Sequence, residues 1–433
     1  MQSLSPVRPA GTGRRRHLRG SLTGLRAALM GAASAVWLAS GLAIDVAGSV
    51  PSPPTDVRVL RAWNERGPQS SISCPAGAVD IAPGTNIQNV VNGYGGNTAF
   101  CLKAGVHYLT GAITPKTGNA FVGEYGAVLD GTNWSTTDPN TGAFRAHNQD
   151  IDNVTIRNLV IRNMSQRGIH AFYNYSDGWT IENNEIASNR TGLNVPGASM
   201  VRNNHIHHNG AGGYLMYKGS STTFENNEIA YNGTEQKVVG TMNVTFRGNF
   251  VHHNAADGIW YDADNTGALI EGNTVEDNAR VGIFYEISGQ AVIRHNVVRR
   301  SGDNGIFIST SKHVEIHNNT LEDNFRGIQY FVNCDAVGGG IIGWDLANNS
   351  AHNNIVVVGT RSGSLGNMLS HLGSCTSTQV QPYVNGSKNL VFDGNNYVVP
   401  SVTTRYWMWG LSNFKSFDEW RGLGQDTAGV VSQ

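Results

Sequence analysis

The chain carries a hydrophobic pattern that repeats about every 23 residues. In each copy an apolar residue stands three positions before a fixed Asn, and another stands two positions after it. The spacings between successive copies of this Asn are 20, 23, 22, 24, 23 and 23 residues. The repeated residues are Asn184, Asn204, Asn227, Asn249, Asn273, Asn296 and Asn319. A repeat of this length predicts a solenoid in which one repeat forms one coil.

Each repeat reads as short strands joined by tight bends. Asn accepts the left-handed backbone of such a bend, and stacked Asn amides can hydrogen-bond from coil to coil. The two apolar residues around the bend should point inward. The repeat lacks the Leu positions of a leucine-rich repeat and the doubled period of a propeller. We therefore expect an all-β fold, a single-stranded right-handed parallel β-helix.

The rest of the chain divides around this solenoid. Residues 1–45 have the pattern of a signal peptide, 46–73 of a Pro-rich linker, and 74–400 of the β-helix domain. Residues 401–433 should form a tail that packs on the end of the helix. Helical spacing at 85–92 predicts an N-terminal capping helix, since an open first coil would expose strand edges. Residues 334–390 are predicted to depart from the regular coils as an irregular excursion.

The amino-terminal segment and the cysteines indicate export. Six Arg and no acidic residue lie in residues 1–44, where a basic stretch precedes an apolar run. This pattern predicts secretion, with a retained membrane anchor as the alternative. The four cysteines fit an oxidising compartment, and their order along the chain suggests Cys74–Cys101 and Cys334–Cys375 disulfides. After signal cleavage we expect no association with a membrane.

Charge narrows the range of partners. Without residues 1–44 the chain has 25 basic and 32 acidic residues, a net charge of about −7, and it has only seven Lys. This balance argues against nucleic acid, whose phosphates require clustered cations. It also favours neutral over polyanionic glycans, although a local basic groove could override the average.

The strand after each Gly-Ile or Gly-Leu pair alternates inward and outward side chains. Its inward positions are Ile169, Leu193, Tyr214, Ile259, Ile283, Ile306 and Ile328, followed by Ala171, Val195, Met216, Tyr261, Tyr285, Ile308 and Tyr330. We expect the outward face to expose Trp260, Phe284 and Tyr217 beside Asp262 and Glu286. Such a groove of aromatic rings and carboxylates is typical of a site for an oligo- or polysaccharide. The alternative is that loops bury the rings and the acids make ordinary surface hydrogen bonds.

Asp262 and Glu286 are 24 residues apart and hold equivalent positions in successive coils. Neighbouring strands lie about 4.8 Å apart, so the carboxyl groups should be roughly 5 Å apart. Retaining glycosidases hold their two carboxyl groups at about this separation, and inverting enzymes need a wider gap. Two carboxylates this close also oppose each other's ionisation, so one should keep its proton near neutral pH.

At these residues the chain resembles known secreted β-helix proteins. The repeats from about 150 to 356 are similar to those of pectate-lyase-like proteins. Gly258-Ile-Trp-Tyr-Asp-Ala-Asp-Asn265 and Gly282-Ile-Phe-Tyr-Glu-Ile-Ser288 resemble a motif pair of glycoside hydrolase families 120 and, more loosely, 141. The resemblance to family 120 implies Asp262 as nucleophile and Glu286 as acid/base.

Many proteins with this motif pair also carry a Thr-Glu-x-Gly-Gly-x-Lys stretch one coil earlier. Here Thr234-Glu-Gln-Lys-Val-Val-Gly240 keeps Glu235, lacks the Gly pair and displaces the Lys to Lys237. This departure puts a substrate-binding role for Lys237 in doubt.

Two other functions remain open at this stage. Asp262, Asp264 and Glu286 could bind Ca²⁺ in a polysaccharide lyase acting on uronate polymers, with Lys237 or Lys218 as base. The protein could also be a non-catalytic glycan-binding β-helix or an adhesin. In the hydrolase interpretation no metal or cofactor is needed.

Two groups of histidines lie outside this motif pair. His205, His207, His208, His252 and His253 lie two coils apart and are interpreted as surface packing rather than as a metal site. His170 falls four coils from the acid pair, where it is interpreted as a distal subsite or plain surface.

Overall fold

The computed structural model describes residues 66–171, 176–334, 343–361, 363–370, 375–410 and 414–433. The predicted signal peptide at residues 1–45 and the first part of the predicted linker, residues 46–65, lie outside the described residues. The described residues fall within one compact unit. No helix in these ranges has the length and apolar character needed to span a bilayer.

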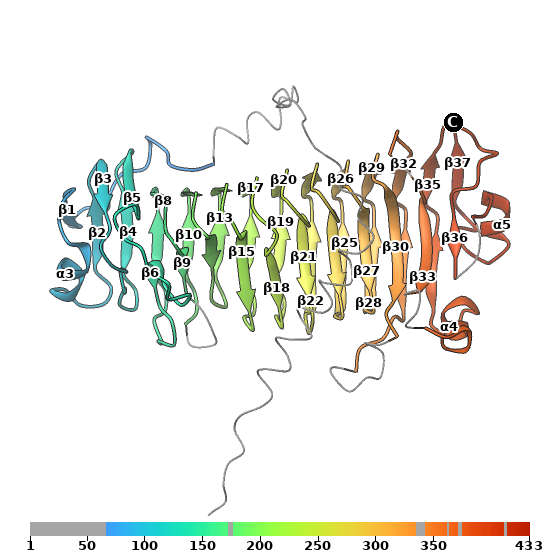
Figure 1. Ribbon diagram of the computed structural model, residues 1–433, viewed down its shortest axis with the longest axis horizontal. Coiled ribbons are helices and arrows are strands. Elements are labelled where there is room, and N and C mark those ends of the chain that lie inside the picture. Colours follow the sequence, from blue (N-terminus) through green and yellow to red (C-terminus); the bar gives the residue numbers. More distant parts are fainter. Residues whose placement is uncertain (1–65, 172–175, 335–342, 362, 371–374, 411–413) are drawn as a thin grey trace, which may run out of the picture. The chain divides into compact units, whose positions relative to one another are not determined.

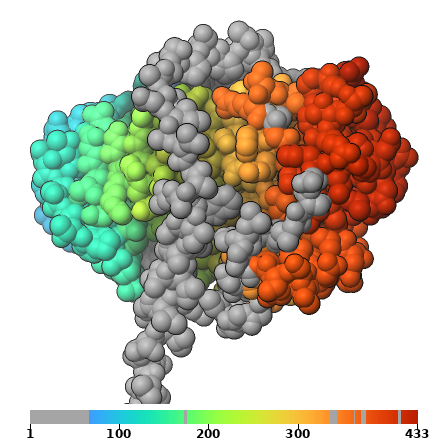
Figure 2. Space-filling view, turned by 45° about the vertical axis from the view of Figure 1, so that its right-hand side comes forward, coloured from blue at the N-terminus to red at the C-terminus, as the bar shows by residue number. Residues whose placement is uncertain are grey.

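Three parallel sheets form the solenoid, and most coils contribute one strand to each (Figure 1). Within the described ranges they contain 13, 13 and 11 strands. In the space-filling view the colours follow the chain order from one end of the solenoid to the other (Figure 2). The predicted parallel β-solenoid is confirmed.

The strands of each sheet follow in order along the solenoid. The first sheet consists of β1 (Val79–Ile81), β2 (Ala99–Leu102), β4 (Ala120–Gly123), β7 (Thr155–Arg157), β10 (Thr180–Glu182), β13 (Met200–Arg202), β16 (Thr223–Glu225), β19 (Thr245–Arg247), β22 (Thr266–Glu271), β25 (Gly289–Arg294), β28 (Lys312–His317), β31 (Asn349–His352) and β34 (Leu390–Asp393). The second consists of β3 (Gly105–Tyr108), β5 (Ala127–Asp130), β8 (Val160–Arg162), β11 (Glu185–Ala187), β14 (His205–His207), β17 (Glu228–Ala230), β20 (Phe250–His252), β23 (Thr274–Glu276), β26 (Val297–Arg299), β29 (Thr320–Glu322), β32 (Ile355–Val357), β35 (Asn396–Val398) and β37 (Val430–Ser432). The third consists of β6 (Gly142–Arg145), β9 (Arg167–His170), β12 (Thr191–Asn194), β15 (Gly212–Tyr217), β18 (Lys237–Val239), β21 (Ile259–Asp262), β24 (Ile283–Glu286), β27 (Asn304–Ser309), β30 (Arg326–Val332), β33 (Gly366–Ser370) and β36 (Met408–Trp409).

The two neighbouring residues at this bend, which are both Asn in four of the seven repeats, have different roles. The first takes the left-handed backbone, as at Asn203 and Asn226 with φ of 54° and 53°. The second is buried and hydrogen-bonds to its equivalent in the next coil; Asn204 Nδ2 donates to Asn227 Oδ1 over 2.9 Å. The predicted Asn ladder therefore forms, one residue after the left-handed position.

Aligned side chains fill the interior. All fourteen positions predicted to point inward in the third sheet are buried. Equivalent rings stack between coils, as Phe224 does on Phe246 with centroids 4.5 Å apart. Because the strands pair in parallel register, equivalent residues of successive coils stack on one another. One apolar column therefore continues through many coils.

Helices lie at the two ends of the solenoid (Figure 1). Helix α3 (Ile87–Asn92) lies near the first coils and buries Ile87 and Val91. That this helix seals the first coil stays a prediction. Helices α4 (Ser377–Val384) and α5 (Phe417–Arg421) lie at the other end, and both begin with a capping box.

The solenoid extends beyond two predicted boundaries. The expected irregular excursion at 334–390 is wrong in part, because β31, β32 and β33 form a further regular coil there. The predicted tail supplies β36 and β37, which pair with β33 and β35. At the amino end, residues 66–73 of the predicted linker contact the bends; Gly67 N donates to Asn203 O over 2.9 Å.

Both suggested disulfides are present. Cys74 is bonded to Cys101 and Cys334 to Cys375, with Cα atoms 5.5 and 5.2 Å apart. The two bonds lie towards opposite ends of the solenoid. They close loops of the chain and so restrict the unfolded ensemble.

Candidate functional site

The two carboxylates are in register on adjacent strands of the third sheet. Strands β21 and β24 pair with Asp262 opposite Glu286 and Trp260 opposite Phe284. The alternate residues Tyr261 and Tyr285 point into the core and are fully buried. Alternation therefore places Asp262 and Glu286 together on the outer face, one rung apart.

Lys237 joins this pair from the preceding strand, β18. Its Nζ donates to Asp262 Oδ2 over 2.8 Å and lies 4.5 Å from the centroid of the Trp260 ring. Burial by itself lowers the pKa of Lys237, but the charge and hydrogen bond of Asp262 outweigh it, and the net pKa is raised. In the sequence analysis the altered motif put a substrate-binding role for Lys237 in doubt. In the structure, Lys237 is the cation that pairs with Asp262.

Glu286 holds its proton to unusually high pH. Burial, followed by the charges of Asp262 and Asp257, raises the pKa of Glu286 to about 8. Lys237 acts in the opposite direction. Only Asp262 of the two acids forms the ion pair with Lys237. The site therefore combines a carboxylate and a carboxylic acid at neutral pH.

The indole of Trp260 lies against this acid. Its N–H group lowers the pKa of the Glu286 carboxyl. By distance and angle, however, Nε1 makes no hydrogen bond in the described part of the chain. The indole N–H is thus close to Glu286 but poorly aligned, and it remains a donor for a further group.

A third carboxyl, Asp257, was missed by the sequence analysis. Its side chain is fully buried, its Oδ1 accepts from Val281 N over 3.1 Å, and Arg280 Nε lies 3.8 Å away. Burial raises the pKa of Asp257. The only sequence signal is that Asp257 directly precedes the Gly258-Ile259 pair. The residue type at this position differs from coil to coil.

The predicted exposed aromatic surface is wrong. Trp260 is only 8% exposed and Phe284 only 4%. The two rings stack nearly parallel, 5.6 Å apart, and continue into a cluster outside the main core. This outer cluster consists of Trp260, Val281, Phe284, Phe307 and Phe331, with Leu369 packed against it. Apolar stacking along the row explains the burial, so these rings form the wall of the site rather than an open platform.

The other predicted site residues make separate contacts. Tyr217 is close enough to influence the pKa of Lys237 and is partly exposed. Asp264 accepts a hydrogen bond from Trp344 Nε1 over 2.9 Å. Glu235 instead faces Arg190, at 4.0 Å. Lys218 is anchored by its backbone N–H to Val239 O at the end of β15.

Calcium binding by Asp262, Asp264 and Glu286, the lyase alternative, stays a prediction. Within the described ranges, no three His, Cys, Asp or Glu side chains are arranged to hold a metal ion. Asp262 is paired with Lys237, and Asp264 is engaged by Trp344. A cation beside Asp262 would have to compete with the ammonium group.

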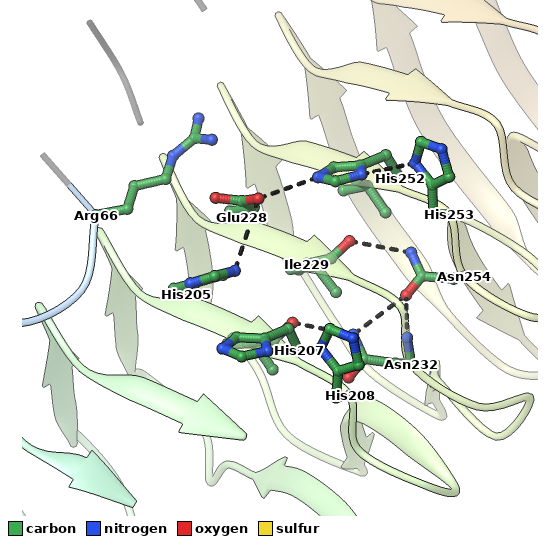
Figure 3. Close-up of polar contacts among 12 residues, drawn as sticks. Arg66, His205, His207, His208, Glu228, Ile229, Asn232, His252, His253 and Asn254 are labelled. Carbon is green, nitrogen blue, oxygen red and sulfur yellow. Dashed lines mark hydrogen bonds and ion pairs between the residues drawn. The ribbon is translucent and has the colours of Figure 1, made fainter. Parts of the chain in front are cut away.

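The histidine groups lie on the second sheet, two coils apart as predicted (Figure 3). Glu228 lies between them, with Oε1 3.1 Å from His252 Nε2 and 3.7 Å from His205 Nε2. Burial lowers the pKa of His205 to about 4, so its ring is neutral at pH 7. This bridging carboxylate, missed in the sequence, makes the cluster a packing contact between coils.

A family comparison identifies the fold independently. The family model described as "Right handed beta helix region" matches residues 141–266 and 197–370. Together these matches span more than half of the 433 residues. The chain belongs to this right-handed β-helix family, and the predicted handedness is confirmed.

Solved structures share the architecture at low sequence identity. The A-module of the Azotobacter vinelandii mannuronan C-5 epimerase AlgE6 is 15% identical, with a TM-score of 0.60, over 80% of this chain and 93% of that one. The A-module of AlgE4 from the same organism is also 15% identical, with a TM-score of 0.57, over 83% and 98%. At this identity the likeness shows the fold alone. A search of the curated proteins finds no match.

Proposed function

We propose that the protein is a secreted carbohydrate-active enzyme, a retaining glycoside hydrolase whose nucleophile is Asp262 and whose acid/base is Glu286. The observation that carries the proposal is the in-register pair on β21 and β24, with one acid ion-paired and the other protonated. Two disulfides support an oxidising, extracellular setting. The matched β-helix architecture supports a glycan substrate by analogy.

The first step forms a bond between Asp262 and the sugar. An Asp262 oxygen attacks the anomeric carbon while Glu286 gives its proton to the departing glycosidic oxygen. The products of this step are a free alcohol, a glycosyl ester on Asp262 and an ionised Glu286. Lys237 holds the attacking carboxylate in place through its second oxygen, Oδ2.

The second step releases the sugar with its original configuration. The ionised Glu286 takes a proton from water, the water oxygen attacks the anomeric carbon, and the bond to Asp262 breaks. Glu286 is then protonated again and Asp262 is again a carboxylate. A spacing of one rung favours this double displacement because it leaves little room for a water molecule between Asp262 and the anomeric carbon.

Covalent trapping tests the assignment directly. We expect a member of a panel of dinitrophenyl 2-deoxy-2-fluoroglycosides to inactivate the protein and add one glycosyl mass to the peptide that contains Asp262. The Glu322→Gln variant, altered at an exposed acid of β29 on the second sheet, should label equally. Label on another residue, or hydrolysis of a natural glycan with inverted configuration, would contradict the proposal.

The pH profile should fall on its alkaline side near pH 8. Glu286 works as an acid only when protonated, and its pKa is raised from 4.5 to about 8. Below this value the acid form dominates; as pH rises through it, kcat/KM should fall about tenfold per pH unit, because kcat/KM reports the pKa values of the free enzyme. Initial rates between pH 5 and 10 on the glycan identified by screening provide the measurement.

Two variants should move this alkaline limit in opposite directions. Lys237→Met removes a charge that lowers the pKa of Glu286, so the limit should shift to higher pH. Asp257→Asn removes a charge that raises the same pKa, so the limit should shift to lower pH. Equal limits in both variants would show that another group sets the profile.

A further inference from the structure

The outer row that carries Lys237 and Trp260 continues several coils towards the amino end. Strand pairing aligns Arg145 with His170, His170 with Asn194, Asn194 with Leu215, and Leu215 with Lys237. One face of the third sheet thus connects a basic region at β6, β9 and β12 with the acid pair.

Arg167 is the central cation of this region. Its Nε donates to Asn194 Oδ1 over 3.2 Å, while its NH1 group is buried without a hydrogen-bond partner in the described ranges. Burial and then the neighbouring charge of Arg190 lower the pKa of Arg167. A guanidinium has five donors, and leaving a buried one unused costs free energy.

Asn194 is a second incompletely satisfied donor. The residue is fully buried, its Oδ1 accepts from Arg167, and its Nδ2 has no partner in the described part of the chain. Next to it, His170 Nε2 lies 3.2 Å from His147 Nδ1. Burial and the nearby Arg167 lower the pKa of His170 to about 2, so this ring adds no charge of its own.

In the part of the chain that the structure describes, few negative groups lie around these cations. Arg145 Nε donates to a backbone carbonyl, Asn140 O, over 2.9 Å rather than to an acid. Arg190 is 46% exposed, and its partner Glu235 lies 4.0 Å away. Asp138 is the other nearby carboxylate that acts on Arg167. Within the described ranges, these three guanidinium groups thus have two exposed acids near them, although the chain without residues 1–44 carries a net charge of about −7.

We propose that Arg145, Arg167, Arg190 and Asn194, here called the basic subsite, bind the carboxylate or sulfate group of an anionic glycan. The unused donors of Arg167 and Asn194 and the proximity of Arg190 all favour an anion at this place. From β12 to β21 is three rungs, about 14 Å, so one oligosaccharide can reach from the subsite to Asp262. The inference rests on the proposed function, because it names the substrate class of the same face. It differs from the preference for neutral glycans drawn from net charge, because a local basic groove can outweigh the average charge.

Binding to a catalytically silent protein tests the subsite. In the Glu286→Gln background, calorimetry at low salt should compare tetragalacturonate, an alginate tetrasaccharide and a sulfated galactan tetrasaccharide with the methyl ester of tetragalacturonate and a neutral galactan tetrasaccharide. We expect at least one anionic ligand to bind at least tenfold more tightly than its neutral counterpart. The ligand that binds distinguishes a carboxylate from a sulfate.

Arginine variants locate the effect. Arg167→Gln and Arg190→Gln should each weaken anion binding roughly tenfold to a hundredfold, as expected for a lost charged hydrogen bond. Arg202→Gln should not, because Arg202 lies on β13 of the first sheet, paired with Glu182. Near-equal binding of charged and neutral ligands, or equal weakening by Arg202→Gln, would overturn the subsite.

The two proposals can fail separately. Labelling of Asp262 without arginine-dependent binding would keep the hydrolase and reject the basic subsite. Arginine-dependent anion binding, together with full turnover by Glu286→Gln, would keep the subsite and reject the hydrolase.

Discussion

Asp262→Asn is expected to reduce kcat by about 10³–10⁴-fold, because an amide cannot form the glycosyl ester. Asp262 is also the partner of Lys237, and both side chains are largely buried. The single variant should therefore lose stability as well, since it leaves a buried ammonium group without its counter-charge. The measurements are the steady-state rate and the urea midpoint of the same preparation.

The double variant Asp262→Asn with Lys237→Met separates catalysis from folding. Removing the unpaired charge should recover part of the lost stability, while turnover stays absent. Glu286→Gln should lose about 10²–10⁴-fold in turnover rate on substrates with poor leaving groups. The loss should be much smaller on dinitrophenyl glycosides, because dinitrophenolate departs without protonation. Glu322→Gln serves as the carboxyl-to-amide control. Restoration of turnover in the double variant would remove Asp262 from the nucleophile role.

Asn227→Ala is expected to destabilise the protein by about 2–5 kcal/mol, the largest effect on folding that we predict. Asn227 Oδ1 accepts from both Asn204 N and Asn204 Nδ2, over 3.0 and 2.9 Å, and Asn227 Nδ2 donates to Val201 O over 2.8 Å. All of these groups are buried and would lose their partner together. Urea unfolding followed by far-ultraviolet circular dichroism measures the change.

The neighbouring Asn226 provides the matched control. This residue has φ of 53° and a largely exposed side chain, so Asn226→Gly keeps the backbone conformation without opening the ladder. Its effect should stay below about 1 kcal/mol. Similar losses for both variants would mean that the bend conformation, and not the buried amide ladder, holds the coils together.

Repetition explains why so much of the fold was predictable. Each coil repeats the same arrangement of apolar and polar residues. A pattern that is ambiguous in one copy therefore becomes specific when seven copies share it. The alternation of residues along each strand predicted which side chains of the third sheet point inward. Tyr261 and Tyr285 are buried as predicted. The coil at β31–β33 was missed because the segment between β30 and β31 separates it from the regular spacing.

The site was predictable only where it follows the repeat. Equivalent positions in adjacent coils placed Asp262 opposite Glu286. Lys237 belongs to a shorter strand, and its ion pair depends on a side chain crossing from one row to the next. Asp257 and Arg167 lie at strand beginnings, where direction is set by the bend and not by alternation.

The sequence alone determined the solenoid, its inward columns and the disulfide pairing, because these properties are local or repeat with every coil. Only the tertiary structure decided which outward side chains are exposed, which acid is ion-paired and which keeps its proton. Those properties depend on burial and on charges from several coils at once, as the buried stack of Trp260 on Phe284 illustrates. A linear pattern gives the direction of a side chain, whereas its environment comes from neighbours distant in the chain.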